Sequence, residues 1–212
     1  GGDSHWKRSN IKQKKNNSQN TFTFLTISRF SSEKAIDQLI KAFARFEKNN
    51  NNVSLLIGGY GPEKLALEAL VRQLNLSERV KFLGALSQEE VRDALTMCDF
   101  FVLSSLIEAQ PVVICEAFSM GVPVLATSVV SDDVVNSDTG ILVEVNNINA
   151  LEQGLYLAKQ NVNQFDSKKI KRFAFENFGY NAVLRQIESV YQSINEWLLC
   201  LKKYLIKFLW YI

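Results

Sequence analysis

Two glutamates in the middle of the chain have a spacing that would let both carboxylates serve one ligand. Glu108 and Glu116 are separated by seven residues within SSLIEAQPVVICEAFSMGVPVLAT, which covers 104–127. Eight positions are slightly more than two turns of an α-helix, so residues at this distance on one helix share a face. Pro111 lies between them and suits the first turn of a helix. We therefore expect Glu108 in a loop and Glu116 on the second turn of the following helix, both facing one cleft.

The predicted start of that helix adds a second chemical possibility. The first N–H groups of a helix have no partner within it and carry a partial positive charge, which makes them a natural phosphate site. Two glutamates at this spacing are, taken alone, more often solvated helix charges than a binding site. The pattern becomes informative only together with the elements that position it.

Strands and helices alternate along the chain. Short apolar, β-prone runs predict strands at 22–27, 53–57, 80–83 and 99–103, a fifth entered through 121–126, and a sixth at 141–143. We expect Ser32 to cap a helix with an apolar stripe, and Ser87 to form a capping box with Glu90. That stripe is Ala35, Ile36, Leu39, Ile40, Phe43 and Phe46.

Further helices complete the pattern. One should run to about Leu74 with apolar residues Leu65, Leu67, Leu70, Val71 and Leu74, and others lie near 147–161, 166–177 and 179–196. This alternation predicts an α/β fold, with a Rossmann-like, doubly wound parallel sheet of about six strands flanked by helices.

Residues with useful chemistry gather where the predicted strands end. Arg29 and Lys34 follow the first strand, the glycine-rich turn 58–61 follows the second, and Glu108 follows the fourth. Ligands of doubly wound sheets bind outside the carboxyl ends of the strands. The turn is not the dinucleotide fingerprint, because the third glycine position counted from Gly59 is Lys64. These residues should therefore converge on one site.

The segment from Glu108 onward resembles the motif of the GT-B glycosyltransferases, in particular the retaining family 4 (glycosyl transferases group 1). The family pattern of two Glu seven residues apart, then Ala-x-x-x-Gly-x-Pro-Val-x-Ala, is matched by Glu108, Glu116, Ala117, Gly121, Pro123, Val124 and Ala126. Upstream, the family's two cations are matched by Arg29 and Lys34, and its Gly-x-Gly-Pro by 59–62. Family glycines are replaced by Ser28, Ala35 and Ala109.

The resemblance implies a role for each matching position. Arg29 and Lys34 would hold the donor diphosphate and stabilise the charge on the leaving nucleotide without a metal. Glu108 would contact the donor sugar hydroxyls, which makes these three residues the catalytic candidates. Glu116 would accept hydrogen bonds from the ribose hydroxyls. The other donor-binding candidates are Gly59, Gly61, Phe82, Leu83, Ala109, Gln110, Pro111, Val112 and Val113.

The resemblance covers about residues 22–195 and concerns the C-terminal, donor-binding domain of a GT-B enzyme. It implies binding of a nucleotide-diphosphate sugar, with UDP- or GDP-sugars first, and transfer to a glycan or lipid-linked acceptor with retention. The nucleotide sugar is a substrate, so no cofactor is expected. The N-terminal acceptor domain is missing from this sequence, so we expect donor binding without efficient transfer.

Two other classes of protein fit parts of the pattern. The lost glycines around Arg29, Lys34 and Glu108 would suit a non-catalytic Rossmann-like interaction or regulatory domain. A phosphoacceptor receiver domain shares the alternation of strands and helices. It needs an acidic cluster after the first strand, where this chain has Ser28 and Arg29.

Composition sets broad limits. The 212 residues are 47% hydrophobic and 22% charged with a net charge of +2, which is ordinary for a globular α/β domain. Cys98 and Cys115 lie in apolar contexts typical of core thiols in a reducing compartment. The single His5 lies in a polar stretch, and no metal-ligand spacing is present. No signal peptide or 18-residue apolar run is found, so we expect a cytoplasmic protein.

The two ends differ from the middle. Residues 1–20 are basic, polar and without periodicity, which predicts a linker or disordered lead-in. A basic arm for nucleic acid or an anionic membrane is the alternative, but basic terminal arms are commonplace, so no nucleic-acid partner is expected. Residues 21–196 form the predicted nucleotide-sugar-binding domain. The tail 197–212 is apolar with Lys202, Lys203 and Lys207. It suits either a helix at the inner face of a membrane or one that packs on the missing domain.

Overall fold

A computed structural model of the chain describes residues 21–108 and 112–179. The predictions for 1–20, for the helix at 179–196 and for the tail 197–212 lie outside these residues, as do Ala109, Gln110 and Pro111. Contacts divide the chain into a unit that ends at Lys171 and a second that begins at Arg172.

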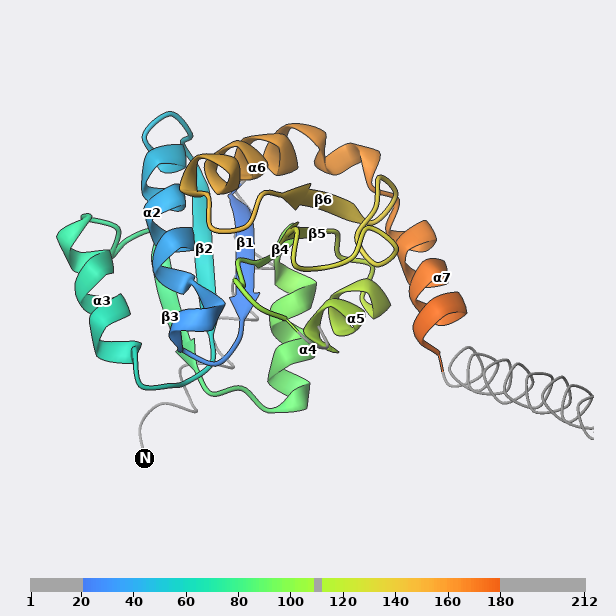
Figure 1. Ribbon diagram of the computed structural model, residues 1–212, viewed down its shortest axis with the longest axis horizontal. Coiled ribbons are helices and arrows are strands. Elements are labelled where there is room, and N and C mark those ends of the chain that lie inside the picture. The colour runs from blue at the N-terminus through green and yellow to red at the C-terminus, as the bar shows by residue number, and fades with distance from the viewer. Residues whose placement is uncertain (1–20, 109–111, 180–212) are drawn as a thin grey trace, which may run out of the picture. The chain divides into compact units, whose positions relative to one another are not determined.

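Six parallel strands form one sheet in the order β3-β2-β1-β4-β5-β6. The strands are β1 Phe22–Ile27, β2 Val53–Gly58, β3 Val80–Gly84, β4 Phe100–Leu103, β5 Val124–Thr127 and β6 Gly140–Val143. The order reverses between β1 and β4, so these neighbours border the topological switch point of the sheet (Figure 1). The predicted doubly wound, Rossmann-like sheet is confirmed.

Helices cover both faces of the sheet. The α-helices are α2 Ile36–Glu47, α3 Lys64–Gln73, α4 Gln88–Met97, α5 Val112–Ser119, α6 Ile148–Asn161 and α7 Ser167–Phe178. Buried side chains of α2, α3 and α6 share one apolar cluster with the strands, and α2 lies beside α6 (Figure 1). The helix α4 contacts β1 and α5 contacts β5, with buried side chains outside that cluster. The sheet is therefore covered on both faces, as parallel sheets require.

Local signals placed most elements within a residue or two. The capping box of Ser87 and Glu90 at the start of α4 is confirmed, with hydrogen bonds in both directions. The predicted apolar stripe of α2 is also buried. Of the apolar residues named for α3, Leu67 and Val71 are buried, whereas Leu65 is 77% exposed.

The start of α2 differs from the prediction. Ser32 does not cap this helix, because the chain first makes a 3-10 turn, η1 Ser32–Lys34, and α2 begins only at Ile36. The N-cap position belongs to Ala35, which has a left-handed backbone with φ +46°. Ser31 precedes the turn, and its hydroxyl lies 2.6 Å from a carboxylate oxygen of Glu33. The extra turn moves Lys34 away from the helix and toward the sheet edge.

Candidate functional site

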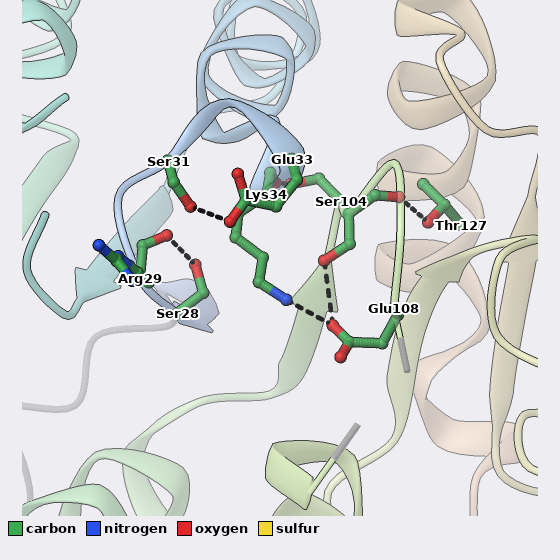
Figure 2. Close-up of polar contacts among 9 residues, drawn as sticks. Ser28, Arg29, Ser31, Glu33, Lys34, Ser104, Glu108 and Thr127 are labelled. Atoms are coloured by element: carbon green, nitrogen blue, oxygen red, sulfur yellow. Dashed lines mark hydrogen bonds and ion pairs between the residues drawn. The ribbon is translucent and has the colours of Figure 1, made fainter. Parts of the chain in front are cut away.

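An ion pair bridges the switch point of the sheet. The Nζ atom of Lys34, at the end of η1, lies 2.8 Å from Oε2 of Glu108, in the loop that follows β4 (Figure 2). The side chains are 20% and 11% exposed, so both charges are largely removed from water. Removing either partner would leave the other charge poorly compensated. Two residues that sequence analysis proposed for the same ligand are thus joined across 74 positions.

Hydrogen bonds from the end of β4 connect the two loops that carry this pair. The Ser104 hydroxyl donates to the Lys34 carbonyl over 2.8 Å, and the Leu106 N–H donates to the Glu33 carbonyl over 2.7 Å. The Ser105 hydroxyl lies 3.3 Å from the same Oε2 of Glu108 that Lys34 contacts. The two loops therefore form one hydrogen-bonded unit at the carboxyl edge of the sheet.

Sequence reasoning did not assign Ser104, Ser105 or Thr127 to the site. The Thr127 hydroxyl, at the end of β5, donates to the Ser105 carbonyl over 2.5 Å. All three residues are buried, and each lies at or just after the end of a strand. A small hydroxyl residue at or directly after the end of an apolar β-prone run is a signal that could have found them, because polar groups at such buried places need hydrogen-bond partners.

Arg29 does not join the ion pair. It is exposed, and Figure 2 shows its guanidinium directed away from Lys34 and Glu108. Glu33 is a nearby acidic residue that the sequence analysis did not consider. A hydrogen bond from Ser31 lowers the pKa of Glu33, and its own backbone, Lys34 and Arg29 act in the same direction. The loop after β1 thus carries a carboxylate between its two cations.

The glycine-rich turn after β2 packs against the loop that carries Arg29. A Cβ on Gly59 would lie 1.8 Å from the Ser28 carbonyl oxygen, and one on Gly61 would lie 2.4 Å from the Phe30 carbonyl oxygen. The Gly59 N–H donates to the Gly84 carbonyl over 2.8 Å. These contacts give the glycines a packing reason that is independent of any ligand. Their predicted role in donor binding stays a prediction.

Phe82 and Leu83 lie in β3, the edge strand on the same side as that turn. The ring of Phe82 packs edge-to-face on Phe30, with 6.1 Å between ring centroids and 76° between the planes. Phe82 thereby links β3 to the loop after β1. The strand β3 is parallel to the others, so its carboxyl end lies at the same end of the sheet as the loops that carry Lys34 and Glu108.

The helix α5 carries the remaining described candidates. Glu108 lies in the loop before it and Glu116 on its second turn, as predicted. Val112 is 62% exposed, whereas Val113 and Glu116 are partly buried. That Glu108 and Glu116 face one cleft stays a prediction.

Within 21–108 and 112–179, no group of three or more His, Cys, Asp or Glu is placed to hold a metal ion. Among the helices of these same residues, none combines the length and apolarity needed to cross a membrane. Burial raises the pKa of the Cys98 thiol to about 12, and it also raises that of Cys115. Both thiols are free and only partly buried, so their predicted place in the core stays a prediction.

Comparison with known proteins identifies the class. Residues 7–173 match the family model of the glycosyl transferases group 1, so the chain belongs to this family. The chain is 30% identical over 172 residues to N-acetyl-alpha-D-glucosaminyl L-malate synthase of Bacillus anthracis, covering 79% of this chain and 44% of that enzyme. It is 34% identical over 112 residues to the gpi3 subunit of phosphatidylinositol N-acetylglucosaminyltransferase from Schizosaccharomyces pombe, covering 53% of this chain and 25% of that protein.

The fold has counterparts among solved structures. Anabaena Alr3699/HepE, solved in complex with UDP and glucose, superposes with a TM-score of 0.72 at 23% identity, over 90% of this chain and 53% of that one. This likeness supports the GT-B fold. The chain spans less than half the length of the two relatives named above.

Proposed function

We propose that this chain is the donor-binding part of a retaining, family 4-like glycosyltransferase. Its site would bind a nucleotide-diphosphate sugar at the carboxyl edge of the sheet. The observation that carries the proposal is the Lys34–Glu108 ion pair, because it joins an ammonium that can bind phosphate and a carboxylate that can accept from hydroxyls at the switch point between β1 and β4. Ligands of doubly wound sheets bind at this position.

The ion pair can serve both parts of a nucleotide sugar. An ammonium group has three N–H donors, so Lys34 can contact phosphate oxygens while it keeps Glu108. As the glycosidic bond breaks, negative charge grows on the leaving diphosphate. Fixed cations stabilise that charge at the transition state without a metal ion. Arg29 is the second cation, and it would turn toward the ligand on binding.

The carboxylates would recognise hydroxyl groups. Glu108 would accept hydrogen bonds from the donor sugar, and Glu116 from the two ribose hydroxyls. The backbone N–H groups near Val112 and Val113 would face phosphate, because they lie in the first turn of α5. Retention is proposed from the resemblance to family 4.

The names of the relatives suggest the first substrates to test. Two of them transfer N-acetylglucosamine by name, one to L-malate and one to phosphatidylinositol. Alr3699/HepE was solved with UDP and glucose. UDP-sugars are therefore the first donors to try, with GDP-sugars next, and lipid-linked or small hydroxylated compounds the first acceptors. An acceptor domain would have to complete the active site, and we propose a cytoplasmic location with contact to the inner membrane surface.

Calorimetric titration of the chain with UDP, GDP, ADP and CDP tests the proposal. We expect one nucleotide to bind selectively, and we expect Glu116→Ala to lower the affinity for that nucleotide. Lys34→Ala should also weaken binding, on the order of tenfold or more, because it removes a cation from the diphosphate.

A matched control is Lys41→Ala. Lys41 lies 2.7 Å from Asp37 in an ion pair of similar length, but this pair is on the exposed side of α2. It should leave nucleotide affinity unchanged. Absence of binding to all four nucleotides would contradict the proposed function of this chain.

A further inference from the structure

Two consecutive serines contact opposite members of the ion pair. Ser104 and Ser105 directly follow β4, and both are buried. The Ser104 hydroxyl donates to the backbone carbonyl of Lys34 over 2.8 Å. The Ser105 hydroxyl lies 3.3 Å from Oε2 of Glu108. One serine thus fixes the backbone that carries the cation, and the next one fixes the carboxylate.

The hydrogen bonds to Glu108 are asymmetric. Lys34 and Ser105 both contact Oε2, while Oε1 receives no hydrogen bond from any residue in 21–108 or 112–179. Figure 2 shows the contact between Lys34 and Glu108. Two donors on one oxygen fix the rotation of the carboxylate. An ionised carboxylate oxygen is an acceptor only, so Oε1 is the atom presented to an incoming hydroxyl donor.

Ser105 is itself held from a third strand. The buried Thr127 hydroxyl, at the end of β5, donates to the Ser105 carbonyl over 2.5 Å. The order Thr127, Ser105, Glu108, Lys34 therefore connects the end of β5, the loop after β4 and the turn η1 after β1 through polar contacts. Thr127 lies within the sheet, so this series of contacts ties the carboxylate to a rigid element.

We propose that Ser105 is a positioning residue for Glu108 and that Ser104 is a positioning residue for Lys34. Ser105 governs recognition of the donor sugar, because Glu108 presents Oε1 to its hydroxyls. Ser104 affects how tightly the diphosphate binds, because it fixes the backbone of Lys34, whose ammonium would contact the phosphates. This division rests on the proposed function, in which Glu108 meets the sugar and Lys34 the diphosphate.

The two serines should have separable effects on binding. Ser105→Ala removes a hydrogen bond to a charged acceptor, and it should reduce the extra affinity that the sugar adds over the bare nucleotide by on the order of tenfold. The affinity for UDP alone should stay within about twofold of the unmodified chain. Ser104→Ala should instead lower the affinities for UDP and for UDP-sugar by the same factor, on the order of threefold to tenfold.

Calorimetry with UDP, UDP-glucose and UDP-N-acetylglucosamine measures this separation, with GDP and GDP-mannose as the second set. The two variants make the same chemical change at adjacent buried positions, so each is the control for the other. If both variants lose affinity for UDP and for UDP-sugar by the same factor, the proposal is overturned, because the two serines would then share only a structural role. Ser105→Cys, similar in size with a weaker donor, replaces the alanine variant if that chain does not fold.

Crystal structures of the two variants supply a test that needs no ligand. In Ser105→Ala, we expect the Glu108 carboxylate to rotate away from its contact with Lys34. In Ser104→Ala, we expect that contact to remain while the Lys34 backbone shifts. A Glu108 that keeps its 2.8 Å contact in Ser105→Ala would overturn the proposal. A chain that binds no nucleotide would contradict the proposed function, and the crystal structures would still decide the positioning claim.

Discussion

The loops that follow β1 and β2 lie against each other, and each contains a residue with a positive φ angle. This residue is Ala35 in the loop after β1 and Gly59 in the loop after β2. After β2, Gly59 has φ +129° and no room for a side chain, because its Cβ would meet the Ser28 carbonyl at 1.8 Å. After β1, Ala35 has φ +46° and fits with its methyl group buried. Left-handed backbone costs a residue with a Cβ about 1–2 kcal/mol, which a fold can tolerate. Overlap with a backbone carbonyl cannot be relieved by a small shift.

The resemblance places a family glycine at both 35 and 59, and this difference gives a physical reason why the one at 35 can be replaced and the one at 59 cannot. Position 35 requires only a positive φ angle, so an alanine can occupy it at a moderate energetic cost. Position 59 needs both the φ angle and the empty space, so glycine is required. Gly84 is a third case, since it has φ +72° and a Cβ added there would have no atom within 4 Å. The three positions therefore separate the cost of the backbone angle from the cost of space.

Gly59→Ala should have the largest effect. The added methyl must displace the Ser28 backbone, so we expect a loss of more than about 3 kcal/mol in the free energy of unfolding, or a chain that does not fold. Chemical denaturation followed by circular dichroism measures the change. A loss under about 1 kcal/mol would show that the β1 loop can move aside and that the comparison is wrong.

Breaking the ion pair should come next. Lys34→Met leaves the Glu108 carboxylate, 11% exposed, without its cation, and we expect a loss of about 2 kcal/mol. A double-mutant cycle with Glu108→Gln should give a coupling energy of about 1–2 kcal/mol. The same cycle on the exposed Lys41–Asp37 pair should give under about 0.5 kcal/mol. Equal coupling in the two cycles would show that burial adds nothing to the Lys34–Glu108 pair.

Gly84→Ala should have a smaller effect than Gly59→Ala. Its methyl meets no other atom, so only the backbone angle opposes it, at about 1–2 kcal/mol. The lower entropy of the unfolded alanine chain offsets about 0.5–1 kcal/mol of that cost. We expect a net loss of about 1 kcal/mol by the same denaturation measurement. A loss as large as that of Gly59→Ala would mean that the angle, and not the space, decides both positions.

Ala35→Gly should have the smallest effect. The substitution relieves about 1–2 kcal/mol of backbone cost. It also removes a buried methyl worth about 0.8 kcal/mol and adds unfolded-state entropy worth about 0.5–1 kcal/mol. These effects nearly cancel, so the free energy of unfolding should change by less than about 0.5 kcal/mol. A gain above about 1 kcal/mol would identify Ala35 as a strained residue beside Lys34.

Local patterns in the sequence were enough to predict the fold class and most of the elements. Periodicity, the Ser87–Glu90 capping box and the β-prone runs act over a few residues, and such short-range signals decide where strands and helices form. The same reasoning put Glu108 in a loop and Glu116 on a second helical turn. It failed for Ser32, because the 3-10 turn before α2 depends on a left-handed alanine that no propensity predicts.

Which polar groups meet was decided by the assembly of the sheet. The contact between Lys34 and Glu108 exists because β1 and β4 are neighbours at the point where the strand order reverses. The hydrogen bond from Ser104 to the Lys34 carbonyl depends on the same pair of strands, and the one from Thr127 to the Ser105 carbonyl depends on the pairing of β5 with β4. The contact between Ser105 and Glu108 is local, because the two residues are three positions apart in one loop. Pairing across 74 residues is a property of how strands assemble, and residue spacing along one chain carries no direct record of that assembly.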